Sequence, residues 1–222
     1  MIARAGPFAH SPRRPPFHRS WPSAPPGLNG CIPLAGADLV RAVTGREMLA
    51  AQRFVHDCLV EEGLLEAQDN GLRLRPQDAM PESALFAAVR QGRILAVASV
   101  SIDAEAMGLP CAGPFALELD QLRQSGRHIC EIAIHPSPAS PSAKLICQEL
   151  DRLCLAHGAL LGCDTAMRVV EPWREPHLSG RGFRTFGPTR TFGSDAPFPA
   201  RLVLKRVGGD HPHPPAGLIR HW

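Results

Sequence analysis

The chain has 222 residues, of which 44% are hydrophobic and 20% charged, which is the composition of a globular protein with one sizeable core. Residues 1–37 contain four arginines and no acidic residue, so this segment carries +4 while the whole chain carries +3 and the remainder −1. This balance excludes the basic excess that nucleic-acid binding requires, and we expect no nucleic-acid partner.

Cysteine usage and hydropathy indicate a cytoplasmic protein. The seven cysteines are an odd number and include no CxxC pair, which favours a small hydrophobic role in a reducing compartment over disulfides or a zinc site. No apolar run approaches the roughly 18 residues that span a membrane. The proline-rich N-terminus has no continuous apolar stretch of the kind a signal peptide needs.

The chain divides into two tails and one domain. Residues 1–37 hold eight prolines without periodicity and are expected to be disordered. Residues 208–222 read as a second disordered tail. The domain is therefore expected to span residues 38–207.

The first half of the domain predicts strand, helix and hairpin in turn. Residues 38–43 predict an opening strand, and Thr44 and Glu47 have the spacing of a capping box for the helix that follows. Two strands, 84–90 and 93–102, are then joined by a tight Gln-Gly turn, which is a hairpin pattern.

The second half alternates helices and strands. A strand of apolar and β-branched residues spans 128–135, and a helix spans 141–157 with Gly158 at its end. The remaining predicted elements are a helix near 115–124, a strand around 159–164, a short helix or turn at 173–180, and a strand pair at 183–192 and 200–207.

Glu131 is the carboxylate in the middle of that central apolar strand. Period-two alternation places it on the face of Ile129 and Ala133, opposite Cys130, Ile132 and Ile134. A carboxylate there needs a cavity or a partner, because burying it unpaired is expensive. A salt bridge with Arg123 or Arg127 and a role in a functional site are both open. The chain has no dinucleotide, nucleotide or metallohydrolase motif.

The order of elements, the EIAIHP strand end with a helix directly after it, and the segment GRGFRTFG resemble a GNAT-fold acyltransferase. The segment GLPCAGPFALELDQLRQSGRHICEIAIHP resembles the N-acyl amino acid synthases and, more distantly, the acyl-homoserine-lactone synthases. The resemblance covers about residues 38–206. It implies an α/β fold with a central mixed, largely antiparallel sheet flanked by helices.

The resemblance also implies where an acyl thioester binds. The backbone of Ile132, Ala133 and Ile134 would hold the pantetheine arm, and the start of the next helix, with Ser140, Ser142 and Lys144, would receive the phosphates. The phosphate loop usual in the family does not match here, and three prolines at 136, 138 and 141 lack the N–H groups of a phosphate cradle. An acyl carrier protein is therefore easier to accommodate than acetyl-CoA as the donor.

The implied chemistry is attack of an amine on the thioester. Glu131 is the first candidate for general base and His135 the second, unless His135 only caps the strand. The tyrosine that serves as acid in many relatives is replaced by Leu178.

Three functions remain open. The first is an N-acyltransferase that moves an acyl chain from acyl carrier protein or acyl-CoA to an amine such as an amino acid, without a permanently bound cofactor. The second is an acetyl-CoA-dependent N-acetyltransferase, and the third a catalytically silent binding protein of the same fold. Residues 109–118 lie either against a membrane or carrier protein, or in a surface loop.

Overall fold

The computed structural model describes residues 21, 32–34, 36–137, 143–193 and 197–207. The strands are β1 (Ile32–Leu34), β2 (Ala37–Arg41), β3 (Ala84–Arg90), β4 (Arg93–Ile102), β5 (Ile129–Pro136), β6 (Thr165–Val170), β7 (Arg184–Phe192) and β8 (Phe198–Arg206). The helices are α1 (Gly45–Glu61), α2 (Ala116–Gln124), α3 (Ala143–Leu160) and α4 (Glu175–Ser179), with 3-10 turns η1 (Pro76–Ala79) and η2 (Pro172–Arg174).

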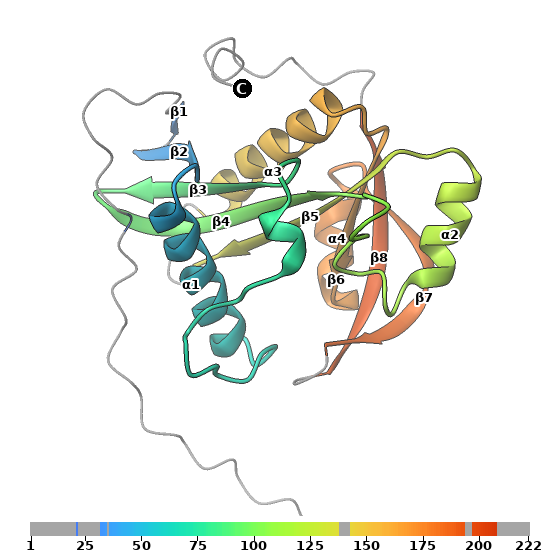
Figure 1. The fold of residues 1–222 in the computed structure, drawn as a ribbon, viewed down its shortest axis with the longest axis horizontal. Helices are drawn as coiled ribbons and strands as arrows, with labels where there is room; N and C mark the ends of the chain where they lie inside the picture. The colour runs from blue at the N-terminus through green and yellow to red at the C-terminus, as the bar shows by residue number, and fades with distance from the viewer. Residues whose placement is uncertain (1–20, 22–31, 35, 138–142, 194–196, 208–222) are drawn as a thin grey trace, which may run out of the picture.

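These strands form one mixed sheet flanked by helices (Figure 1). Its order is β1-β2-β3-β4-β5-β6-β8-β7. Neighbouring strands are antiparallel except β5 and β6, which run parallel in the middle of the sheet and are connected through α3. The predicted α/β class, with a mixed and largely antiparallel sheet, is confirmed.

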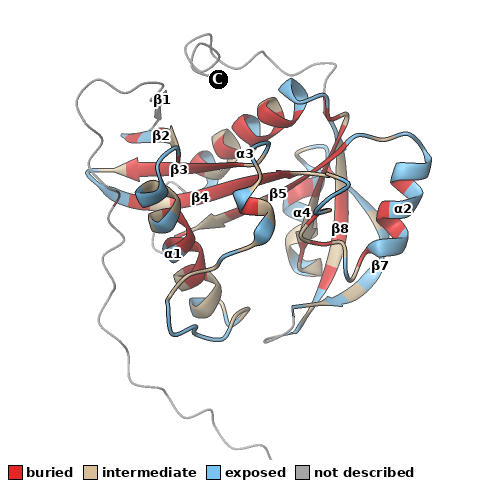
Figure 2. Ribbon diagram, viewed as in Figure 1, coloured by how far each residue is buried: buried red, intermediate tan, exposed pale blue. Residues whose placement is uncertain are grey.

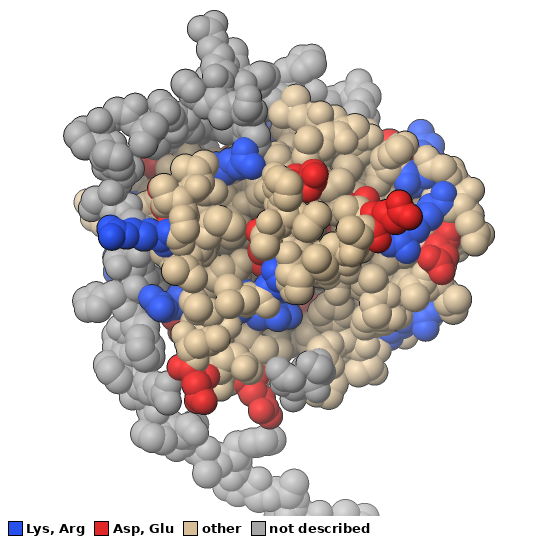
Figure 3. Space-filling model, in the orientation of Figure 1, with Lys and Arg blue, Asp and Glu red and all other residues tan. Residues whose placement is uncertain are grey.

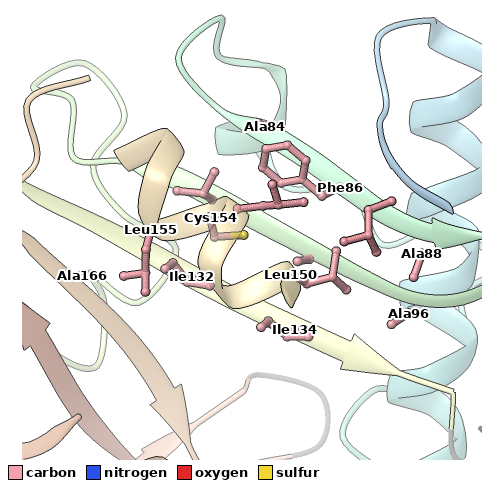
Figure 4. Close-up of a cluster of buried hydrophobic side chains, with 14 of the residues drawn as sticks. Ala84, Phe86, Ala88, Ala96, Ile132, Ile134, Leu150, Cys154, Leu155 and Ala166 are labelled. Atoms are coloured by element: carbon pink, nitrogen blue, oxygen red, sulfur yellow. The ribbon is translucent and has the colours of Figure 1, made fainter. Parts of the chain in front are cut away.

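The two faces of the sheet are covered by different helices. On one face α3 packs its Leu150 and Cys154 against Phe86, Ile132 and Ile134 of the central strands (Figure 4). The opposite face is covered by α1 and by the segment from residue 103 through α2, whose clusters include Leu85, Val97, Ile129 and Met167. Buried residues follow the central strands and α3, whereas α2 and β7 are largely exposed (Figure 2). The period-two alternation predicted for β5 is therefore confirmed.

Local signals placed the first helix and the hairpin correctly. The Thr44 hydroxyl accepts the Glu47 N–H at 3.3 Å, and the Glu47 carboxylate accepts the Thr44 N–H at 2.9 Å, which completes the capping box. Gln91 and Gly92 both have positive φ, 50° and 73°, as the two central residues of a type I′ hairpin turn do.

The end of α3 and the strand after it were predicted wrongly. Gly158 lies inside the helix, which continues to Leu160, and β6 begins only at Thr165. A Cβ at Gly158 would lie 2.7 Å from the Cys130 sulfur, so the glycine permits close approach of α3 to β5. The turn is made by Gly162, which has a positive φ of 81°.

Part of the segment predicted as an N-terminal tail belongs to the fold. Trp21 is only 8% exposed, packs in the cluster beneath α1, and donates its backbone N–H to the Gly92 carbonyl at 2.7 Å. β1 adds a further strand beside β2. The sheet therefore begins before residue 38. The other residues of both predicted tails lie outside the described residues, apart from Gly36 and Ala37 at the start of β2.

The segment 109–118 turns three of its apolar side chains inward. Leu109, Cys111 and Phe115 are buried in the cluster beneath α2, so they do not form a face for a membrane; Leu117 is exposed. Within the described ranges, no helix is both long and apolar enough to cross a membrane. Basic and acidic side chains are interspersed over the face shown in Figure 3.

Candidate active site

The two parallel strands of the sheet separate after a short contact. β5 and β6 pair at Ile129, Cys130 and Glu131, opposite Thr165, Ala166 and Met167. Beyond these residues both strands continue, but their described residues no longer pair with each other, whereas β5 stays paired with β4 to Pro136. The backbone of residues 132–136 thus has an edge that β6 does not use.

A cavity of about 380 Å³ lies at this separation, within the size range of small-molecule sites. Apolar side chains from α1, from the segment before η1, from β3, from β6 and from the β7–β8 end form much of its wall: Val55, Leu59, Leu64, Leu65, Leu74, Leu85, Val169, Phe192 and Phe198. Its polar wall includes Glu131, His135, Gln52, Ser99 and four arginines, at 73, 75, 168 and 174.

Glu131 lies on the cavity wall with 5% of its surface exposed. Its Oε2 accepts the backbone N–H of Cys111 at 2.9 Å. The salt bridges considered from sequence do not form, because Arg123 pairs with Asp103 at 2.7 Å and Arg127 with Asp164 at 3.6 Å.

The surroundings of Glu131 act on its pKa in opposite directions. Burial raises the pKa of Glu131 above its ordinary value, while the positive charge of Arg75 and the hydrogen bonds from Cys111 work against that rise. Burial and the Glu131 charge raise the pKa of the Cys111 thiol, which stays protonated beside the carboxylate.

A buried polar network holds Arg75. Its Nε and Nη2 donate to the two carboxylate oxygens of Asp78, at 3.1 and 2.7 Å, and Nη2 also donates to the Ser99 hydroxyl at 2.8 Å. Gln52 of α1 donates its side-chain amide to Asp78 at 2.6 Å. Residues from α1, η1 and β4 therefore orient one guanidinium group at the cavity.

His135 lies further along β5 on the same cavity, half-buried. Burial lowers the pKa of His135 to about 3, together with the positive charges of Arg75, Arg168, Arg174 and Arg73. Its imidazole is neutral near pH 7 and is a far weaker base than a solvated histidine. Of the two, Glu131 is the more deeply buried.

The residues predicted to hold the donor are only partly brought together. Ile132, Ala133 and Ile134 line the cavity at the unpaired edge of β5. Lys144 is exposed on the first turn of α3 and is not part of the cavity wall. Ser140 and Ser142 lie outside the described residues. Leu178, at the position of the absent tyrosine, is buried beside Phe183.

The four cavity arginines and Asp78 were missed from sequence. Arg75 and Asp78 lie in RPQD, a polar stretch without helical or strand periodicity, and their spacing of three residues was the one available signal. Arg168 stands at 3.7 Å from Asp151 of α3, and Arg174 pairs at 2.9 Å with Glu62, the residue that follows α1. These are contacts between distant segments, which only the fold reveals.

Comparison with known families places the chain in one of them. Residues 50–203 match the family model of the N-acyl amino acid synthase FeeM. The chain belongs to this family. It is an acyltransferase that transfers an acyl group to an amine, as the resemblance implied.

Solved structures share the fold at low sequence identity. FeeM from uncultured soil microbes has a TM-score of 0.65 at 20% identity and covers 76% of this chain and 90% of its own. The acyl-homoserine-lactone synthase LasI has a TM-score of 0.54 at 12% identity, covering 79% and 93%. A GNAT-superfamily phosphinothricin acetyltransferase from Sinorhizobium meliloti has a TM-score of 0.50 at 16% identity, covering 83% and 96%. No curated protein sequence matches the chain.

Proposed function

We propose that the protein joins an acyl chain, carried as a thioester on acyl carrier protein or CoA, to the amino group of an amino acid, with Glu131 as general base. The observation that carries this proposal is a buried carboxylate of raised pKa on the wall of a largely apolar cavity, where β5 and β6 separate. The thioester serves as co-substrate, and no permanently bound cofactor is needed.

In the proposed reaction, the acceptor nitrogen attacks the thioester carbonyl. Glu131 takes one proton from the acceptor ammonium, and the resulting amine forms the N–C bond. The C–S bond then breaks, and the second proton of the attacking nitrogen leaves with the carrier sulfur as the free thiol. The backbone N–H groups of the free edge of β5 are suited to hold the pantetheine arm and the developing oxyanion. Thiols ionise near pH 8.5, so the leaving group needs little acid assistance, and Leu178 in place of an acid is compatible with turnover.

The cavity wall supports a medium or long acyl chain. Val55 and Leu59 of α1, and Leu74 before η1, offer apolar surface that a two-carbon acetyl group would leave unused. Pro136, Pro138 and Pro141 remove donors from the segment that would cradle a CoA pyrophosphate, which favours the single phosphate of a carrier protein. Both carriers occur in the cytoplasm, where we propose that the enzyme works.

The test replaces Glu131 by glutamine. Because general-base help is worth about 10²- to 10⁴-fold in rate, Glu131→Gln should lower turnover by that factor with decanoyl thioesters of carrier protein or CoA. Lipid extracts of a host that overproduces the wild type should contain an N-acyl amino acid that is absent with the variant. Mass spectrometry detects the product in both settings.

Glu105→Gln is the matched control, since Glu105 is an exposed acid away from the cavity. Equal turnover by wild type and Glu131→Gln would remove Glu131 from the mechanism. Absence of any N-acyl product from the wild type would refute the proposed function, and preference for acetyl-CoA would support the N-acetyltransferase instead.

A further inference from the structure

Three hydrogen bonds hold the Arg75 side chain at the cavity wall. Its side chain is 17% exposed, and the Asp78 side chain that grips it is 6% exposed. Asp78 accepts both the Nε and Nη2 groups of the guanidinium, and Ser99 accepts a second Nη2 bond. Since a guanidinium is a planar fork, these three bonds set the direction of its remaining nitrogen.

That remaining nitrogen, Nη1, makes no hydrogen bond with any residue in the described part of the chain, although Arg75 lines the cavity. Its two N–H groups are available to a ligand. A carboxylate is the natural acceptor, because charge-assisted bonds from arginine to carboxylate are among the strong ones in proteins.

Arg75 and Glu131 form a matched pair of charges on one cavity. The Arg75 charge acts on the pKa of Glu131, yet the two side chains form no direct ion pair. An amino acid in water is a zwitterion, whose ammonium group is complementary to the Glu131 carboxylate and whose carboxylate is complementary to the Arg75 guanidinium. With the ammonium group beside Glu131, where the proton must leave, the carboxylate would have Arg75 as a cationic partner on the wall of the same cavity.

The other cavity arginines are less suited to this task. Arg174 pairs with two carboxylates, those of Glu62 at 2.9 Å and Glu171 at 3.0 Å, whereas Arg75 pairs with one. Arg168 lies on the α3 face of β6, opposite the face that carries Glu131, and stands 3.7 Å from Asp151 of α3, although its buried Nε has no hydrogen-bond partner among the described residues. Arg73 has another contact in the structure.

We propose that Arg75 is a specificity-determining residue that binds the carboxylate of the acceptor, so that the enzyme acylates amino acids in preference to amines without a carboxylate. This inference rests on the proposed function and deepens it. It predicts discrimination against an amino-acid amide, which lacks the negative charge and leaves the Nη1 donors without a charged partner.

The test compares each common L-amino acid with its amide, using decanoyl thioesters of carrier protein and of CoA. In Arg75→Gln, kcat/KM for the acid should fall about 10- to 100-fold more than kcat/KM for the amide, mainly through KM, whereas the rise in the Glu131 pKa on loss of the Arg75 charge affects both acceptors alike. Because Arg75→Gln leaves the Asp78 carboxylate buried without its cation, the double variant Arg75→Gln/Asp78→Asn is measured beside it. Arg152→Gln, on the exposed face of α3, controls for loss of a positive charge and should behave as wild type.

Two kinetic results would overturn the inference and leave the proposed function in place. One is a wild type that uses acid and amide equally well. The other is an equal loss with both acceptors in the folded double variant. If the wild type acylates no amine at all, the proposed function fails. The role of Arg75 is then tested by measuring how the acids and amides bind. Saturation-transfer NMR with the same acids and amides should then show acid binding that is lost in Arg75→Gln, and equal binding by wild type and variant would refute the role of Arg75.

Discussion

At the scale of single residues, the protonation state of the Glu131 carboxyl group should make the reaction rate depend on pH. Only its ionised form accepts a proton from the amine. Because burial raises its pKa, the ionised fraction falls at a higher pH than for a solvated glutamate, whose pKa is about 4.3. The neighbouring charges that set this balance are those of Arg75 and Asp78.

The first prediction is a pH profile. In wild type, kcat/KM should decrease as the pH falls through the raised pKa of Glu131, and this acidic limb should be missing from the residual activity of Glu131→Gln. Steady-state rates between about pH 4 and 9 measure it. If the rates of wild type and Glu131→Gln decreased in parallel at low pH, the group that titrates would not be Glu131.

The second prediction concerns stability. A raised pKa means that the folded state binds the Glu131 proton more tightly than the unfolded state, so ionisation destabilises the fold as the pH rises from about 4.3 through the raised value. Glu131→Gln should therefore melt at a higher temperature than wild type at neutral pH, with the difference shrinking below about pH 4. Thermal melts across this range test the sign, with Glu105→Gln as control.

Sequence reasoning found Glu131 but not Arg75, for a physical reason. A charged residue inside an apolar strand breaks a period-two pattern, and such a break is visible in one dimension. Arg75 and Asp78 lie in a polar stretch where charges are ordinary. Their importance comes from Gln52 and Ser99, which only the fold brings to them.

At the scale of elements, the contact between α3 and β5 depends on Gly158. In an exposed helix, replacing glycine by alanine would add about 1 kcal/mol of stability. Here a Cβ would stand 2.7 Å from the sulfur of Cys130, inside a close-packed core. The steric conflict with Cys130 should therefore outweigh the gain in helix propensity.

The third prediction follows from this contact. Gly158→Ala should destabilise the protein by about 1–3 kcal/mol, as overpacked cores do. Adding Cys130→Ala should restore part of the loss, since it removes the sulfur that the new methyl group meets. Urea unfolding of both single variants and the double variant gives the coupling, and purely additive effects would contradict the steric explanation.

The same glycine explains why one element boundary was misjudged. A glycine after an apolar helical run is a common stop signal, and Gly158 was interpreted in that way. The tertiary contact with Cys130 is not encoded in the local pattern. Where the signal was purely local, as in the capping box at Thr44 and the turn at Gln91, prediction and structure agree.

At the scale of the whole molecule, the order of elements and the fold class were predictable because hydrophobic periodicity repeats along the chain. The cavity was not, because its wall combines side chains from α1, η1, β5, β6 and β8. No single segment carries a pattern for it. This is why the sequence located the central strand and left the acceptor side of the site undefined.

The fourth prediction uses the shape of that cavity. Val55 of α1 is buried and lines its apolar wall, so Val55→Phe should reduce the volume available to an acyl chain and shift the preference toward shorter thioesters. Product profiles with a series of acyl lengths measure the shift. Val43→Phe, at an exposed position outside the cavity, is the control, and an unchanged profile in Val55→Phe would place the acyl chain elsewhere.

The separation of β5 from β6 also has a mechanical consequence. β6, β8 and β7 form a small antiparallel unit that joins the rest of the sheet through three residue pairs, at Ile129, Cys130 and Glu131. A pantetheine arm lying along the free edge of β5 would contact both parts of the sheet and restrict their motion relative to each other. We therefore expect a bound thioester to slow amide hydrogen exchange in β6 and β8 more than in β2 and β3. Equal slowing in all four strands would mean that the two parts already move as one body.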